Sequence, residues 1–162
     1  MDPYLDLGEE RGVRALVDRF YDAMETQPFA TGLRAMHAAD LEPMRDRLTA
    51  FLCGWLGGPP RYEERFGHVC MRGAHAPYAI DPALADAWVE CMRLALLDAA
   101  LDAPLDRALL QAFTRTAHML VNRPDPSARA PRHTDGTAAS AGSDAAPDTD
   151  VAHDADGSAA PS

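Results

Sequence analysis

Residues 44–60 read MRDRLTAFLCGWLGGPP and carry the clearest structural signal in the chain. The large apolar side chains recur every three or four residues, which is the spacing of a helix with one apolar face. They are Met44, Leu48, Phe51, Leu52, Trp55 and Leu56. Residues 57–60 are two glycines and two prolines, which cannot continue a helix, so the sequence predicts its end there. Asp40 is the predicted N-cap.

Three further segments on either side repeat the helical spacing. The first covers residues 13–24. The second opens at Asp81 and Pro82, a good capping residue followed by a residue that favours the first turn, and the third runs from near Pro104 to Asn122. No alternation of period two is long enough to indicate a strand. The sequence therefore predicts an all-α domain with four principal helices.

The charge balance excludes several classes of partner. The chain has 162 residues, with 25 acidic and 15 basic side chains, a net charge of −10 and no lysine. Long-range repulsion argues against nucleic acid or anionic lipid as a partner. The longest uncharged run, residues 48–60, is too short to span a membrane, and residues 1–10 lack the basic start and apolar stretch of a signal peptide. We expect a soluble, cytoplasmic protein.

The composition changes at Pro124. Residues 124–162 are mainly alanine, aspartate, serine and proline, with Val151 as the single large aliphatic residue. Such a segment cannot bury enough apolar surface to offset the entropy that it would lose on ordering. The sequence therefore predicts a folded domain at residues 1–123 and a disordered acidic tail at residues 124–162.

The cysteines give no sign of a disulfide framework or a zinc site. Cys53, Cys70 and Cys91 are an odd number, widely spaced, and no two are separated by only two residues. We expect buried, reduced thiols that act as small apolar side chains.

Residues 59–80 connect the second and third predicted helices, and we expect no regular secondary structure in them. Connections of this length are usually functional. His75 lies here without an acidic or cysteine partner at the spacing of a zinc site. A lone histidine is most often structural, but one imidazole among apolar residues also suits a metal whose other ligands come from a cofactor. Haem iron is the leading example.

Tyr21 and Trp88 lie on the apolar faces of their predicted helices, yet each carries a polar hydrogen that needs a partner when buried. Two interpretations are open: these groups bond to backbone carbonyls, or both point into one cavity as donors to a ligand. His37 is a candidate third donor, and Met44 and Leu48 would form the apolar wall. Nucleophilic catalysis has little support, because no serine precedes residue 127 and no Cys–His pairing is apparent.

The chain also contains an ordered set of short motifs. They are Phe20-Tyr21, residues 55–59 (WLGGP), Tyr62, Gly67-His68, Arg72, residues 75–80 (HAPYAI), residues 86–88 (DAW) and Cys91-Met92. Together, across residues 9–121, they resemble the group II truncated haemoglobins. The resemblance implies a truncated globin fold, a two-over-two helical sandwich in which two antiparallel helix pairs enclose a haem.

The resemblance also implies a role for each matching residue. His75 matches the proximal ligand of a haem b iron, Tyr21 and Trp88 match the distal donors, and His37 matches a further distal position. Met44 and Leu48 match the distal-helix positions that face the bound gas. The implied haem contacts are Phe51, Leu52, Tyr62, Phe66, Met71, Tyr78, Ile80 and Met92.

The sequence departs from the family pattern at two positions. The family commonly has an arginine before the proximal histidine, where it pairs with a haem propionate, and this chain has Ala74. Arg72 or Arg65 is the expected substitute. The family favours proline after Gly-His, where this chain has Val69. Neither change removes the iron ligand.

The implied function is reversible binding of O₂, and of CO and NO, at iron ligated by His75, with an unidentified reductant as partner. One alternative is a haem redox enzyme, either a nitric oxide dioxygenase or a peroxidase. Another is a haem-free, globin-like interaction module. Six-coordinate iron, with His37 or Met44 as an internal ligand, also remains open. We expect a monomer or a homodimer.

Overall fold

The computed structural model describes residues 2–68 and 70–124. The chain divides into two units, Met1–Ala130 and Pro131–Ser162, and all described residues belong to the first. The tail expected at residues 124–162 therefore lies, apart from its first residue, outside the described residues. The domain boundary and the disorder of the tail stay predictions.

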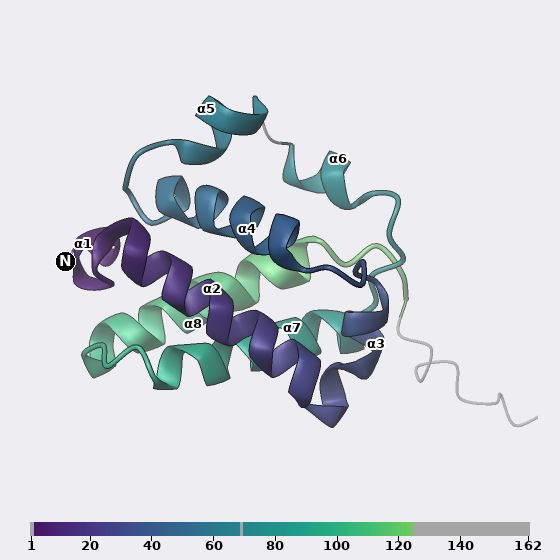
Figure 1. Cartoon of the computed structure of the whole chain (residues 1–162). Helices are drawn as coiled ribbons and strands as arrows, with labels where there is room; N and C mark the ends of the chain where they lie inside the picture. The colour runs from purple at the N-terminus through teal and green to yellow at the C-terminus, as the bar shows by residue number, and fades with distance from the viewer. Residues whose placement is uncertain (1, 69, 125–162) are drawn as a thin grey trace, which may run out of the picture. The chain divides into compact units, whose positions relative to one another are not determined.

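The described residues form helices joined by turns, with no strand among them (Figure 1). The helices are α1 (Pro3–Asp6), α2 (Glu9–Thr26), the 3₁₀ turn η1 (Pro28–Ala30), α3 (Thr31–Ala35), α4 (Glu42–Trp55), α5 (Arg61–Phe66), α6 (Met71–His75), α7 (Pro82–Leu97) and α8 (Ala103–Met119). The predicted all-α class is confirmed. Within the described part of the chain, no helix is both long enough and apolar enough to cross a membrane.

Two of the four principal helices, α4 and α7, begin close to a predicted capping residue. Asp81 caps α7 as expected, because its carboxylate accepts a hydrogen bond from the Leu84 N–H at 2.9 Å. Asp40 is not the N-cap of α4, since the helix begins at Glu42 and the cap position is Leu41. The Asp40 carboxylate still accepts the Glu42 N–H at 3.0 Å.

Helix α2 lies at the centre of the packing. It packs against α4 and α7, and α7 packs in turn against α8 (Figure 1). The side chains of α2 that face these neighbours follow the apolar spacing of residues 13–24 and are fully buried, among them Val13, Leu16, Val17 and Phe20. The apolar face of α2 therefore forms the centre of the core, against which the helices with the candidate site residues pack.

The expectation of no regular structure at residues 59–80 is wrong, because this segment contains α5 and α6. A helix of five or six residues spans less than two turns, so no apolar repeat is long enough to reveal it. Neither helix contributes a buried residue to the core. Figure 1 draws both beyond α4, on the side away from α2, α7 and α8.

The expectation for the cysteines is partly wrong. Cys53 and Cys91 are buried and reduced, as predicted, but Cys70 is exposed. Cys70 occupies the N-cap position of α6, where its sulfur accepts the Gly73 N–H at 3.4 Å. A capping residue must lie outside the helix that it caps, and here that position faces solvent.

Candidate functional site

His75 is the last residue of α6, and its imidazole is held by a single hydrogen bond. The Nδ1 atom lies 2.7 Å from the Met71 carbonyl oxygen, one turn back along the helix. Because a carbonyl only accepts, Nδ1 must carry the proton, and the Nε2 lone pair is left free. Histidine ligands of metals are commonly oriented in this way.

The described residues hold no group of three or more His, Cys, Asp or Glu side chains arranged to bind a metal. A metal at His75 would therefore take at most two His, Cys, Asp or Glu ligands from the described part of this chain. Its remaining ligands would have to come from a cofactor, as they do for haem iron.

The three candidate donors, Tyr21, Trp88 and His37, come from three parts of the chain. Tyr21 lies on α2, Trp88 on α7, and His37 just after α3. Phe20 links the first two, since its ring centroid lies 4.9 Å from that of Tyr21 and 5.1 Å from that of Trp88. The ring of His37 lies edge-on to Tyr21, with centroids 5.9 Å apart. The fold thus joins all three in one aromatic cluster, which we call the distal cluster.

Tyr21 is the most buried member of the distal cluster, at 2% exposed. Burial raises the pKa of its phenol to about 12, although the nearby Arg45 cation acts in the opposite direction. The Arg45 guanidinium carbon lies 5.5 Å from the centre of the Tyr21 ring. The phenol therefore keeps its proton at any physiological pH and remains a hydrogen-bond donor.

A local hydrogen bond, to a backbone carbonyl four residues earlier, fixes the position of His37. Its Nδ1 lies 2.9 Å from the Leu33 carbonyl oxygen, so by the same logic as for His75 its Nε2 is free. Arg34 donates to the carbonyls of Ala38 at 2.9 Å and Ala39 at 3.0 Å, which fixes the loop that follows His37.

A second group of apolar side chains lies on α4 and α5. The Tyr62 ring centroid is 6.2 Å from that of Phe51 and 5.1 Å from that of Phe66. Phe66 is 42% exposed, Met44 is 37% exposed, and Tyr78, beyond α6, is 48% exposed. These candidate residues, two haem contacts and one distal-helix position, present apolar surface that the described part of the protein does not cover.

The other candidate residues differ in burial. Leu48, Met71 and Ile80 are half-buried. Leu52 and Met92 are buried members of the central core. Arg72 and Arg65, the candidate propionate partners, are exposed on α6 and α5.

Three arginines near the candidate residues have no counterpart in the sequence interpretation: Arg34, Arg45 and Arg47. The Arg47 guanidinium lies 5.1 Å from the centre of the Phe66 ring and is a further cation beside the apolar α4–α5 surface. No sequence spacing marks these residues, because each acts on a neighbour from another helix or on the backbone.

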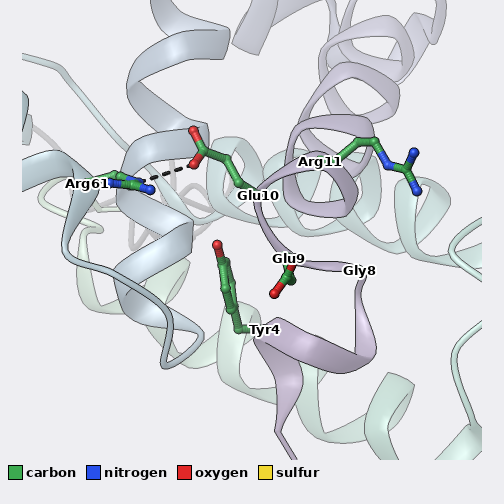
Figure 2. Close-up of a pocket in the computed structure, with 6 residues that line it drawn as sticks. All are labelled: Tyr4, Gly8, Glu9, Glu10, Arg11 and Arg61. Carbon is green, nitrogen blue, oxygen red and sulfur yellow. Dashed lines mark hydrogen bonds and ion pairs between the residues drawn. The ribbon is translucent and has the colours of Figure 1, made fainter.

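An open polar pocket lies elsewhere, at the junction of α1, α2 and α5. Tyr4, Glu10 and Arg61 line it together with residues 8, 9 and 11, as Figure 2 shows. The Arg61 guanidinium donates to the Glu10 carboxylate at 3.2 Å. None of the candidate residues lines this pocket, and two of its charged residues, Glu10 and Arg61, are paired with each other.

Known proteins match nearly the whole of the described region. The family described as "Bacterial-like globin" matches residues 3–122. The chain belongs to this globin family. Among curated relatives of the globin, Group 2 truncated hemoglobin YjbI from Bacillus subtilis (strain 168) is 34% identical over 127 residues, covering 78% of this chain and 93% of that protein.

Solved structures agree with the globin assignment. The cold-adapted truncated hemoglobin from the Antarctic marine bacterium Pseudoalteromonas haloplanktis TAC125 is 37% identical with a TM-score of 0.74, covering 76% of this globin and 99% of that chain. The Group II 2-on-2 hemoglobin from the plant pathogen Agrobacterium tumefaciens is 36% identical with a TM-score of 0.72, covering 77% and 96%. The resemblance to group II truncated haemoglobins and the truncated globin fold are confirmed.

Membership of this family implies a haem cofactor and the binding of diatomic gases. The residues of this globin fit a haem. His75 has a free Nε2, and the exposed apolar side chains of α4, α5 and the segment after α6 offer the uncovered surface that a porphyrin requires.

Proposed function

We propose that this globin is a b-type haemoprotein that reversibly binds O₂, with CO and NO as further ligands. The observation that carries the proposal is the hydrogen bond from His75 Nδ1 to the Met71 carbonyl, which leaves Nε2 free to ligate iron. When bound, the haem supplies an iron atom with a vacant position for a diatomic gas. The chain's own residues bind the haem, exclude water and orient the gas.

Three observations support haem b, held without covalent attachment. Covalent haem attachment requires two cysteines separated by two residues and followed by histidine, and the sequence has no such motif. Phe51, Tyr62 and Phe66 offer a wall of aromatic surface. Arg47, Arg65 and Arg72 are the cations that we assign to the propionates in place of the arginine that Ala74 replaces.

The distal cluster supplies the donors in this proposal. A neutral phenol and an indole N–H are suited to donate a hydrogen bond to a diatomic ligand that carries partial negative charge. His37 is not assigned as a donor, because its Nδ1 proton is used on the Leu33 carbonyl and its free Nε2 is an acceptor. A hydrogen bond of this kind contributes about 1 kcal/mol, so each donor slows ligand release roughly fivefold. Tyr21 is the strongest candidate, because it is the most buried of these side chains, at 2% exposed.

The test of iron ligation is the replacement of His75 by alanine. We expect His75→Ala to lose haem on purification or to show an altered spectrum in the oxidised, reduced and CO-bound forms. His68→Ala is the matched control, since His68 is an exposed histidine between α5 and α6. An unchanged spectrum for His75→Ala would show that another residue ligates the iron.

The test of the distal cluster is the rate of O₂ release from the ferrous protein. Tyr21→Phe and Trp88→Leu each remove one donor while keeping an apolar side chain, so we expect release to be roughly fivefold faster in each. Tyr4→Phe, which removes a phenol at α1, is the control. Parent-like rates in both distal variants would exclude these residues as donors.

The same donors also suit a redox enzyme, because a ligand held for longer has more time to react. Repeated turnover of nitric oxide or peroxide in the presence of a reductant would identify a nitric oxide dioxygenase or a peroxidase. Ligand binding without turnover would identify a binding protein.

A further inference from the structure

The linker between α6 and α7, residues 76–81, follows His75 directly. Helix α6 contributes no buried residue, so the core does not fix its position by packing. Within the linker, the Tyr78 N–H donates to the His75 carbonyl at 3.1 Å. The end of α6 and the first half of the linker are therefore one hydrogen-bonded unit, whose position depends on what holds Tyr78.

Asn122, which lies just after α8, binds this linker through its side chain. The Oδ1 atom accepts the Ile80 N–H at 3.0 Å, and Nδ2 donates to the Tyr78 carbonyl at 2.9 Å. The backbone N–H groups of Asn122 and Arg123 both donate to the Ile80 carbonyl, at 2.9 and 3.0 Å. Four hydrogen bonds thus join residues 78–80 to residues 122–123.

The asparagine side chain is suited to this contact, because its amide carries both an acceptor and a donor. It satisfies a backbone N–H and a backbone carbonyl two residues apart, as a neighbouring strand would do. An aspartate would keep the acceptor and lose the donor. An alanine would lose both, while the backbone bonds to the Ile80 carbonyl would remain.

We propose that Asn122 is a positioning residue for the proximal histidine. It holds Tyr78 and Ile80, and through the bond between Tyr78 and His75 it fixes the end of α6 and the orientation of the imidazole. This inference rests on the proposed ligation of iron by His75. It means that a residue just after α8 fixes the orientation of the His75 imidazole.

The first test is the iron–histidine stretching band of the ferrous full-length holoprotein, measured by resonance Raman spectroscopy. We expect Asn122→Ala to shift or broaden this band, because the imidazole no longer has one fixed orientation. We also expect haem transfer to an excess of a haem-scavenging apoglobin to be about 25-fold faster, because each of the two lost hydrogen bonds contributes about fivefold. Thr116→Ala is the control, since it removes an α8 side-chain bond to Ala112 that does not involve the linker.

The second test needs no haem. In the apoprotein, amide hydrogen exchange at Ile80 should be about fivefold faster in Asn122→Ala than in the parent, because the acceptor of that N–H is gone. Thr116→Ala should exchange at the parent rate. Asn122→Asp serves as a milder variant: it keeps the acceptor for Ile80, so exchange there should stay near the parent rate while the stretching band still shifts.

Two results would overturn the inference. One is a parent-like stretching band in both Asn122 variants, even where exchange at Ile80 is faster. The other is the same shift in Thr116→Ala as in Asn122→Ala. Failure of the proposed function is a separate result, since it would appear as an iron–histidine band that persists in His75→Ala.

Discussion

Tyr21 places an ionisable phenol where water barely reaches, at 2% exposure and beside the Arg45 guanidinium. Burial raises the pKa of this phenol from 10.0 to about 12, so the folded state retains the proton more strongly than the unfolded state does. The resulting stabilisation is complete below pH 10 and is lost as the pH rises from 10 to 12.

We therefore predict that Tyr21→Phe makes the protein less sensitive to alkali. At pH 11 the parent should have lost about 1.4 kcal/mol more of its free energy of unfolding, relative to pH 8, than the variant has lost. Urea unfolding at the two pH values measures this difference. Burial also raises the pKa of Cys91, to about 11, but Cys91 titrates in both proteins and so cancels in the comparison. Equal losses in the two proteins would contradict the prediction.

The sequence identifies candidate site residues by their own chemistry, but it does not reveal which other residues hold them in place. His75, Tyr21 and Trp88 are found because their side chains are unusual for their positions. The sequence does not single out Arg45 or Asn122, because an arginine on a helix and an asparagine at a helix end are usually exposed to solvent. Each acts on a residue that is distant in the sequence. Arg45 contacts Asp18, 27 residues earlier in the chain, and Asn122 contacts Ile80, 42 residues earlier.

At the scale of elements, the junction of α1 and α2 requires glycine within a helix. Gly12 lies in the first turns of α2, where alanine is normally favoured. A Cβ atom there would lie 1.7 Å from the Leu7 carbonyl oxygen, which is backbone and cannot move without displacing α1. Gly54 in α4 offers a comparison, because its Cβ would lie 3.4 Å from the nearest atom, in Pro60.

We predict opposite outcomes for these two glycines. Gly12→Ala should lower the free energy of unfolding by about 2 kcal/mol, as expected of a substitution that forces backbone apart. Gly54→Ala should be neutral or stabilise by about 0.5 kcal/mol through helix propensity. Chemical denaturation of both variants measures the two values. If Gly12→Ala is as stable as Gly54→Ala, α1 does not pack on α2 in this way.

Arginines join α2 to α4 on their exposed side. Arg45 is only 13% exposed, and it binds the Asp18 carboxylate at 3.1 Å and the Asp22 carboxylate at 2.7 Å. Arg14 reaches from α2 to Glu42 at 2.7 Å and Asp46 at 2.9 Å. These ion pairs hold together the two helices that carry Tyr21 and Met44.

We predict that Arg45→Met lowers the free energy of unfolding by about 1 kcal/mol at low ionic strength, and by less at 1 M salt, because the paired carboxylates are partly exposed and screened. Arg107→Met, at an exposed position of α8, should have no comparable effect. Thermal unfolding at two salt concentrations compares them. Equal effects of the two variants would show that Arg45 contributes no specific link.

The predictability of the helices depends on their length. The four long helices are visible in the sequence because each repeats its apolar spacing over three or more turns and has a capping or terminating residue. Helices α1, α3, α5 and α6 are too short to show a repeat. Local capping fixes the start of two of them, by the Asp2 carboxylate in α1 and by the Cys70 sulfur in α6.

At the scale of the whole described domain, Met44, Phe66 and Tyr78 are large apolar side chains that stay exposed, and we assign this open apolar surface to the proposed haem site. We predict that the apoprotein binds a hydrophobic fluorescent dye and that one equivalent of haemin displaces it. Haem in hundredfold excess over its dissociation constant should add about 2.7 kcal/mol to the free energy of unfolding.

Leu97→Gln is the control for this prediction, because Leu97 is exposed at the far end of α7 and is not a candidate haem contact. Dye displacement should be unchanged in this variant. A dye signal that haemin leaves intact would place the open apolar surface outside the haem site.

The four hydrogen bonds between residues 78–80 and 122–123 also bear on the order in which the chain acquires its structure. They close the open ends of the α7–α8 hairpin, whose helices are joined by the short turn from Asp98 to Asp102. Once this hairpin pairs, its two ends are already neighbours, and little further entropy is lost in joining them. We therefore expect Ile80 to gain amide protection together with α7 and α8, ahead of α5, when refolding is followed by pulsed hydrogen exchange. The backbone that follows His75 would then fold as part of a C-terminal unit made of α7 and α8, before α5 has formed.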